Sequence, residues 1–371
     1  MLVCRKRVGR VGIAVAEERQ DGTFPLNYTD VMNLRKTTVA ALLLFFSVDV
    51  ACADGCETDS LAVFEGEVSF ETNYGHNYYG EDRTVFDFPH IEASGSMRLG
   101  KGWSLSAEFE YERFYEDGVW CSSFKDMFST NKLYVNKSFS EKLNVKGGIV
   151  DVPVGLTNSG GPALTIYDPE SESGVLPMSW HETGLAVWGN AGRWCYEVSV
   201  ISCLDFPLNR SCALGMAFRS DITDVVDGLR IGAGGYWGKS SCGMVRRCRA
   251  GEFVGTDGVF FGAADFDFRK NDWIADGSVV YCTDCGAKSA GVEVGYDFAV
   301  LAGLHGKGLV LLPFVRYDGV FEIGARNKMT LGANISPLRN LVLKVEYGHR
   351  RICGVRTEKT FDAGIGYAID I

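Results

Sequence analysis

The sequence of 371 residues contains no long apolar run beyond residue 55. No window there approaches the about 20 consecutive apolar residues that a membrane-spanning helix needs. Stretches with the 3.6-residue period of amphipathic helices are nearly absent as well, which argues against a soluble α/β enzyme of this length. The chain has instead 45 glycines, 23 phenylalanines and 15 tyrosines but only 9 prolines, and this composition suits β-structure.

Histidine is scarce, with five residues in the chain, and neither a G-x-S-x-G, an H-E-x-x-H nor a phosphate-loop pattern occurs. His181 followed by Glu182 is the best candidate for a catalytic pair, yet it stands beside Trp180, where a structural role is commonplace. We therefore expect no enzymatic activity, no cofactor and no metal site. The formal net charge of −10 argues against nucleic acid as a partner.

The first 53 residues are set apart from the rest by their pattern. Residues 32–53 have the form of a secretory signal peptide, with a basic start, an apolar middle and an A-x-A-like cleavage site. A short anchoring helix is the weaker alternative, because about 10 apolar residues cannot span a bilayer. Residues 1–31 precede this complete signal, so we expect them to be an upstream extension with Met32 as the true initiator. Residues 54–371 are then one domain.

From residue 61 onward, segments of about ten residues alternate apolar with polar or small side chains. In residues 103–112 every odd position is apolar and every even position is Ser or Glu. Residues 343–348 repeat the theme, with apolar odd positions and Lys, Glu and Gly between them. A period of two is that of strands with one apolar and one polar face, as in transmembrane barrels. A soluble exported β-sandwich alternates in the same way and is the weaker alternative.

The connections between these segments alternate between short and long. Short ones are expected at 100–102, 140–141, 189–193, 269–272 and 337–340, and long ones at 75–84, 115–128, 151–178, 237–256, 318–326 and 349–357. Bacterial outer-membrane barrels have short periplasmic turns, long extracellular loops and an even number of strands. We therefore predict an all-β fold, a transmembrane antiparallel β-barrel of about sixteen strands.

Several motifs in fixed order carry a family resemblance. They are GGIVDVPVGLTN at 147–158, YDPE at 167–170, LPMSWHETG at 176–184, PFVRYD at 313–318 and NLVLKVEY at 340–347. In these motifs, from about Gly66 to Ile371, the chain resembles the phosphate-selective porin (O and P) family of outer-membrane porins. The resemblance implies a sixteen-stranded, trimeric, passive channel in the outer membrane of a Gram-negative bacterium, with membrane lipid and small solutes as its partners.

Residues 152–178 are expected to form the third extracellular loop, which in general porins folds inward and narrows the channel. The segment is rich in Gly and Pro, carries Asp168, Glu170 and Glu172, and contains no Lys or Arg. With Glu182, which follows it, these are the predicted constriction residues. The alternative, a solvated surface loop, has equal weight.

The polar faces of the predicted strands carry about twice as many acids as bases. The predicted pore-lining residues are Glu65, Glu67, Glu71, Glu108, Glu110, Glu112, Arg219, Arg230, Arg316, Lys328, Lys344 and Glu346. Phosphate-selective members line the pore with arginine and lysine, and the third loop here has neither. We therefore expect a weak preference for cations or neutral solutes rather than phosphate. Some of these charges will instead pair across neighbouring strands.

Ten cysteines remain after Cys4 and Cys52 are set aside, and export makes disulfides the default. Cys203 with Cys212 and Cys242 with Cys248 are each placed to close one loop. Cys282 and Cys285 have redox-motif spacing, but without a βαβ context we expect a hairpin staple rather than redox or metal chemistry. The sequence leaves the connectivity open.

A second function class competes with the channel. A barrel without a conductive pore would serve adhesion or envelope structure through its extracellular loops. The loop at 237–256 favours it slightly, since Arg246, Arg247 and Arg249 form a basic patch able to contact acidic surface polymers.

Overall fold

The computed structural model describes residues 63–371 except 78–82, 117, 121–126, 162, 203–213, 240–257, 284–285, 302, 304–308 and 323–324. The signal peptide and upstream extension expected within residues 1–53 lie outside the described residues. In the part of the chain that is described, no helix has the length and apolar character to cross a membrane.

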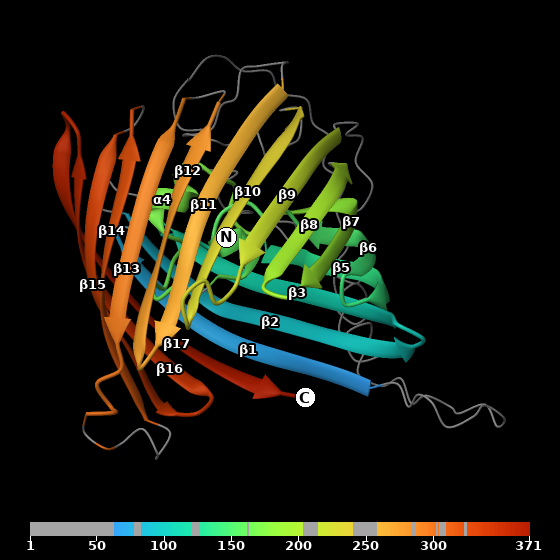
Figure 1. Cartoon of the computed structure of the whole chain (residues 1–371). Coiled ribbons are helices and arrows are strands. Elements are labelled where there is room, and N and C mark those ends of the chain that lie inside the picture. Colours follow the sequence, from blue (N-terminus) through green and yellow to red (C-terminus); the bar gives the residue numbers. More distant parts are fainter. Residues whose placement is uncertain are drawn as a thin grey trace, which may run out of the picture.

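Nearly all of the described chain forms one antiparallel sheet that closes on itself (Figure 1). Long strands pair with their neighbours in sequence, and β1 pairs with β17 to close the ring. Of the seventeen strands, β4 (Val119–Trp120) has two residues and pairs with β3, which leaves a wall of sixteen long strands, as predicted. The long strands are β1 Val63–His76, β2 Thr84–Gly100, β3 Trp103–Glu116, β5 Phe128–Ser140, β6 Leu143–Asp151, β7 His181–Ala191, β8 Trp194–Ser202, β9 Leu214–Ile222, β10 Leu229–Lys239, β11 Gly258–Lys270, β12 Trp273–Cys282, β13 Lys288–Tyr296, β14 Val310–Phe321, β15 Arg326–Leu338, β16 Leu341–Ile352 and β17 Arg356–Asp370.

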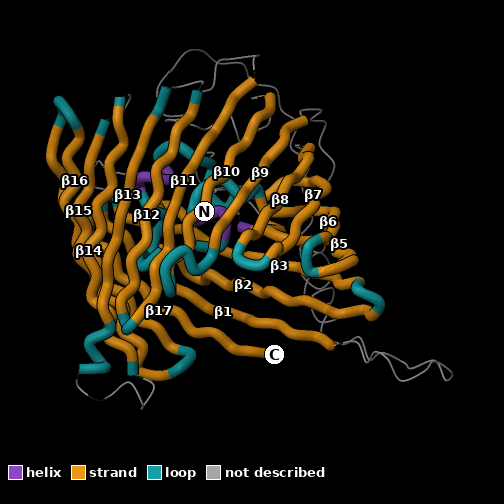
Figure 2. The backbone as a smooth tube through the Cα atoms, in the orientation of Figure 1, coloured by secondary structure: helices purple, strands orange, loops and turns teal. Residues whose placement is uncertain are grey.

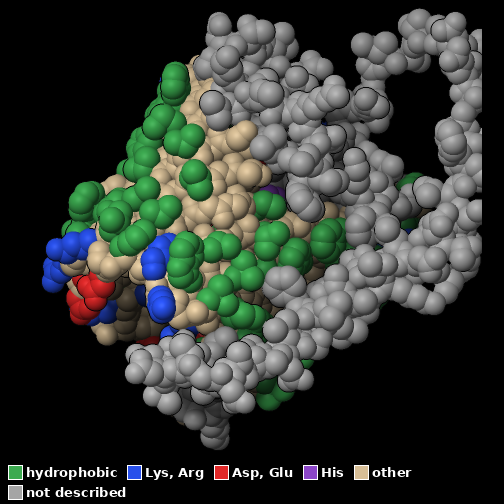
Figure 3. All heavy atoms as spheres, turned by 90° about the vertical axis from the view of Figure 1, so that its right-hand side faces the viewer, with side chains coloured by type: hydrophobic (Ala, Val, Ile, Leu, Met, Phe, Trp, Pro, Cys, Tyr) green, Lys and Arg blue, Asp and Glu red, His purple; other side chains and the backbone are tan. Residues whose placement is uncertain are grey.

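The period of two in the sequence becomes an apolar outer face and a polar inner face. On β16, Val345 and Tyr347 are 41% and 48% exposed, whereas Glu346 between them is 2% exposed and faces inward. The space-filling view shows hydrophobic side chains scattered over the barrel wall (Figure 3). The closed sheet leaves no unpaired strand edge, and its outer face is apolar. A lipid environment requires both of a β-protein.

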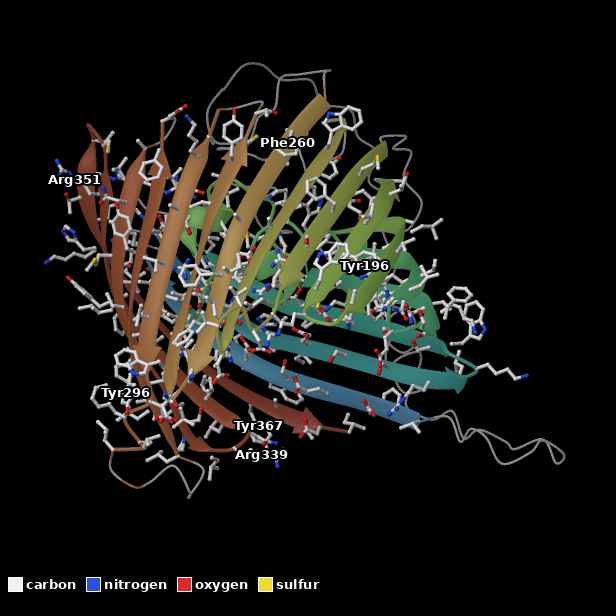
Figure 4. All side chains as sticks on the ribbon, viewed as in Figure 1. Tyr196, Phe260, Tyr296, Arg339, Arg351 and Tyr367 are labelled. Carbon is white, nitrogen blue, oxygen red and sulfur yellow. The ribbon has the colours of Figure 1, made fainter. Side chains whose placement is uncertain are left out.

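Exposed aromatic side chains gather toward both ends of the wall. Trp103, Trp194 and Trp273 each begin a strand at the end with the shortest turns, and Trp237 and Phe321 lie near the opposite end. In Figure 4, Tyr296 and Tyr367 lie toward the first end and Phe260 toward the second. Aromatic rings at both rims of an apolar band are typical of barrels that sit in a bilayer, since the rings settle at the lipid–water interface.

Most connections at the first end are two-residue turns. Between β11 and β12, Asn271 and Asp272 have φ of 49° and 65°, the left-handed pair of a type I′ turn whose twist matches that of the strands. The connections 223–228 between β9 and β10 and 297–309 between β13 and β14 are the exceptions at this end. At the opposite end the last loops are shorter than predicted, at 322–325 and 353–355, because strand pairing continues into the flanking residues.

The connection between β6 and β7, which we call loop 3, folds inside the ring. It contains the short helices η1 (Thr157–Ser159) and α4 (Glu170–Ser173), which lie within the barrel (Figure 2). Its apolar residues pack against the inner wall, where the Trp180 ring lies 4.8 Å from that of Tyr236 and 5.6 Å from that of Phe261. Loop 3 is therefore an internal element of the barrel and not a solvated surface loop.

Glycines on the wall let loop 3 approach it closely. A Cβ atom on Gly291 of β13 would lie 2.2 Å from the Oγ atom of Ser171 in α4. A Cβ atom on Gly234 of β10 would lie 2.7 Å from the carbonyl oxygen of Pro153. Since real Cβ contacts are essentially never this short, a side chain at either position would force the contacting atoms of loop 3 to move.

Candidate functional site

The tip of loop 3 is held by a cluster of cations from β15 and β16. Glu170, 7% exposed, accepts hydrogen bonds from Arg350 at 2.7 Å and from Arg326 at 3.1 Å, and its carboxylate lies 3.7 Å from Lys328 Nζ. Burial favours protonation of this carboxyl group. The three cations, Arg350 foremost, outweigh burial and lower the pKa of Glu170 from 4.5 to about 2. Glu170 is thus a charged anchor between loop and wall.

A second group of contacts joins loop 3 to β13 and β14. The Ser171 hydroxyl donates to Asp318 at 2.7 Å, and the Leu164 N–H donates to Glu293 at 2.8 Å. Arg316, 2% exposed, donates to both carboxylates, at 3.0 Å to Asp318 and 2.9 Å to Glu293. A buried cation shared between two loop-binding acids compensates part of their negative charge.

The predicted constriction residues differ in where they lie. Glu172 is 1% exposed and accepts hydrogen bonds from the N–H groups of Leu156 and Thr157, so it binds loop 3 to itself. Asp168 is half-buried in the loop just before α4, and Glu182 is buried near the start of β7. The charge of Glu170 and Glu172 is therefore directed at protein partners.

A polar cavity of about 760 Å³ lies between loop 3 and the strands on the other side of the ring. Loop 3 contributes Pro153, residues 157–161 and residues 179–180, and His181 at the start of β7 lines the cavity beside them. The strands contribute the charged groups, seven carboxylates against four Lys and Arg: Glu92, Glu108, Glu110, Asp151, Glu197, Asp221 and Asp267 with Lys132, Lys146, Arg219 and Arg230. The cavity therefore carries a formal excess of three negative charges (7 − 4).

Each of these cations pairs with an acid on the same strand or on a strand one or two places away in the sheet. Lys132 Nζ lies 2.7 Å from Glu108, and Lys146 Nζ lies 2.9 Å from Glu197. Arg219 contacts Asp221 at 2.7 Å and Asp265 at 2.8 Å, and Arg230 shares both acids. Cross-strand pairing fixes the side chains against the wall and leaves the space between wall and loop open.

The predicted pore-lining residues fall into three groups. Glu108, Glu110, Arg219 and Arg230 line the cavity. Arg316, Lys328, Lys344 and Glu346 lie beneath loop 3: Lys344 donates to the Thr165 carbonyl oxygen, and Glu346 accepts from the Ile166 N–H. The others lie outside the cavity lining: Glu112 is buried beside His90, and Glu65, Glu67 and Glu71 are exposed on β1.

No family model matches the chain. Among solved structures, OmpF of Salmonella typhi in complex with daunomycin aligns with a TM-score of 0.57 at 13% identity, over 83% of this chain and 97% of that one. OprB of Pseudomonas putida at high pH aligns at 0.56 and 9% identity, over 84% and 94%. OmpT of Vibrio cholerae in its trimer form aligns at 0.55 and 10%, over 84% and 100%. The fold is that of the outer-membrane porins.

A curated relative with a detectable sequence match is an uncharacterized protein of Aquifex aeolicus (strain VF5). It is 21% identical over 135 residues, which cover 36% of this chain and 30% of that protein. The chain thus matches less than a third of the relative's length. These comparisons establish the porin fold, and membership of the phosphate-selective family stays a prediction.

The residues of the porin fold that sequence reasoning missed are those whose role depends on distant partners. Arg350 and Arg326 fall in segments predicted as long connections, at 349–357 and 318–326, and they anchor loop 3 in the structure. Asp87 and His90 on β2 are three residues apart, and because such residues face opposite sides of a regular strand, the sequence does not indicate that they meet. Neither the anchoring of loop 3 nor the approach of Asp87 to His90 leaves a local pattern in the sequence.

The cysteine predictions are mostly untested. Of the proposed pairs, only Cys282 belongs to the described residues, where it is buried at the end of β12. Cys203, Cys212, Cys242, Cys248 and Cys285 lie outside the described part of the chain.

Proposed function

We propose that the chain is a porin of the outer membrane, through which small polar solutes and ions diffuse passively. One observation carries the proposal: a polar cavity of about 760 Å³ separates loop 3 from the strand wall inside a porin-type barrel. Loop 3 narrows the lumen from the β12–β16 side and is anchored there by the ion pair of Glu170 with Arg350 and the hydrogen bond of Ser171 to Asp318. The open passage is then the charged space beside β2–β11.

We infer a weak preference for cations or neutral solutes. The formal excess of acids over bases in the cavity supports this, because fixed charge on a pore wall attracts ions of the opposite sign. The pairing of every cavity Lys and Arg with an acid keeps the preference weak. A phosphate site would need unpaired cations at the narrowest point, and loop 3 contains no Lys or Arg.

Reconstitution into planar bilayers tests both parts of the proposal. We expect stepwise conductance. Under a KCl gradient, the reversal potential should have the sign and size of a modest selectivity for K⁺ over Cl⁻. A folded protein, identified by heat-modifiable migration on a gel, that produces no conductance steps would overturn the channel. It would favour the non-conducting barrel with an adhesive or structural role. Conductance with strong Cl⁻ selectivity would overturn only the charge argument.

We further propose that the porin works as a homotrimer. A solved neighbour, the OmpT protein of Vibrio cholerae, is described in a trimer form, and the wall of this chain carries a continuous apolar face available for lipid and for other copies. Chemical cross-linking in intact cells should trap a species of three chains. A monomer at every cross-linker concentration would contradict this part.

A further inference from the structure

Three ligand-type side chains come together on the inner face of β2 and β3, outside the cavity lining. Atoms of Asp87, His90 and Glu112 lie within 4.8 Å of one another. His90 Nδ1 is 3.0 Å from the nearest oxygen of Asp87 and 4.0 Å from an oxygen of Glu112. Zinc bonds of about 2.0–2.2 Å to nitrogen and oxygen place such ligand atoms roughly 3.4 Å apart, so small side-chain rotations suffice to bring them together.

An irregularity in the sheet creates this juxtaposition. The pairing register of β2 with β3 shifts between Asp87 and His90, and His90 pairs directly with Glu112. On a regular strand Asp87 and His90 would face opposite sides of the wall. The one extra residue on β2 turns both inward, and bulges that re-aim side chains in this way are common beside functional sites.

Asp87 has more acceptor capacity than the described residues satisfy. Asp87 is 2% exposed, and among the described residues its Oδ1 atom has no hydrogen-bond partner. Three carboxylates, those of Asp87, Glu112 and Glu110, surround a single imidazole.

We propose that Asp87, His90 and Glu112 bind a divalent transition-metal ion, with zinc as the best-fitting class. One imidazole nitrogen and two carboxylate oxygens are ligands typical of zinc, and three protein ligands leave a fourth position for water. Nδ1 of His90 is the ligating atom. Its Nε2–H then donates to Glu110 at 2.9 Å, and a carboxylate in this place orients metal-bound histidines in known sites. Glu110 also lines the cavity, which connects the ion to the lumen.

Equilibrium zinc binding to the purified, detergent-folded protein tests the site. The wild type should bind one more equivalent of Zn²⁺ than either His90→Gln or Glu112→Gln. Glu110→Gln should retain that equivalent with an affinity about 10- to 100-fold weaker. His349→Gln is the matched control, because His349 is an exposed histidine on β16, and it should bind as the wild type does.

All of these variants keep the cysteines, so zinc bound by cysteines is the same in each. The difference in bound zinc equivalents between a variant and the wild type therefore reports on this site. Heat-modifiable migration identifies the variants that fold, and two independent ligand variants guard against the failure of one. Equal numbers of zinc equivalents in the wild type and in a folded ligand variant would overturn the site and leave His90 as an imidazolium paired with acids. Because equilibrium binding needs no conductance, the result is independent of the proposed channel.

Discussion

Glu170 shows what a single charge does inside this barrel. Because loop 3 contains no Lys or Arg, the sequence predicts that this carboxylate contacts the ions that pass through the channel. In the structure it is 7% exposed and surrounded by Arg350, Arg326 and Lys328 of the wall. Its energetic importance is therefore structural, since a buried carboxylate with three cationic neighbours stabilises the loop position and the cations alike.

Replacing Glu170→Gln should lower the free energy of unfolding by about 3 kcal/mol, because it leaves buried cations without their shared anion. Urea unfolding of the protein in detergent measures the loss. Glu141→Gln is the control, since Glu141 is an exposed carboxylate in the turn between β5 and β6 and should change stability little. Equal effects of the two substitutions would show that Glu170 is no anchor.

The pH dependence provides a second readout of the same anchor. The pKa of Glu170 is lowered in the folded protein from 4.5 to about 2. A group with a lowered folded pKa stabilises above its unfolded pKa and loses that contribution as the pH falls through the folded value. The wild type should thus exceed Glu170→Gln in stability above pH 4.5, and the two should converge near pH 2. A difference that persists at pH 2 would contradict the charge-based explanation.

At the scale of elements, loop 3 is an insert that the wall does not need for its own pairing. The strands β6 and β7 that flank it are paired over Asn144↔Trp188 to Asp151↔His181 without its help. Inside the loop, the ends of the central segment are close to one another. The Gly161 N–H donates to the Leu156 carbonyl oxygen at 2.9 Å, and Leu176 lies against Gly155.

Replacement of residues 161–175 by a short Gly-Ser linker should therefore leave a folded barrel with a larger single-channel conductance. The reason is that α4 and its anchored tip no longer occupy the lumen beside β12–β14. Bilayer recordings measure the change. Glu170→Gln, which keeps the segment, serves as the comparison and should show less increase. Unchanged conductance after the replacement would show that loop 3 does not limit the passage.

The strands and loop 3 also show which features of the fold the sequence could predict and which it could not. Strand number and facing followed from the period of two, as in residues 103–112, because facing is a local property of a strand. The place of loop 3 could not follow, since Glu170 meets Arg350 across 180 residues and Ser171 meets Asp318 across 147. The pairing of Asp87 with His90 was hidden by a register shift that no local pattern announces.

At the scale of the whole molecule, the lumen combines an acidic excess with dense pairing. Removing one charge of a pair leaves its partner uncompensated. Single neutralising substitutions should therefore change the ion selectivity of the lumen. The pair of Lys146 and Glu197, 2.9 Å apart at the cavity, offers a matched test, because either partner can be neutralised without a large change of shape.

Glu197→Gln should shift the reversal potential under a KCl gradient toward Cl⁻, and Lys146→Gln should shift it toward K⁺. Each variant removes one sign of charge from the same place on the wall, so opposite shifts are expected. Two shifts of the same sign, or none in either variant, would mean that ions do not pass this pair.

The pairing of β1 with β17 joins Glu67 to Asp370, residues from the two ends of the described chain. Until β17 is synthesised, β1 and β16 are open sheet edges whose peptide groups have no partners in lipid. Nothing in the first fifteen long strands can supply those partners. The ring can therefore close only once β17 has been made, and until then both edges must be kept from pairing with other strands.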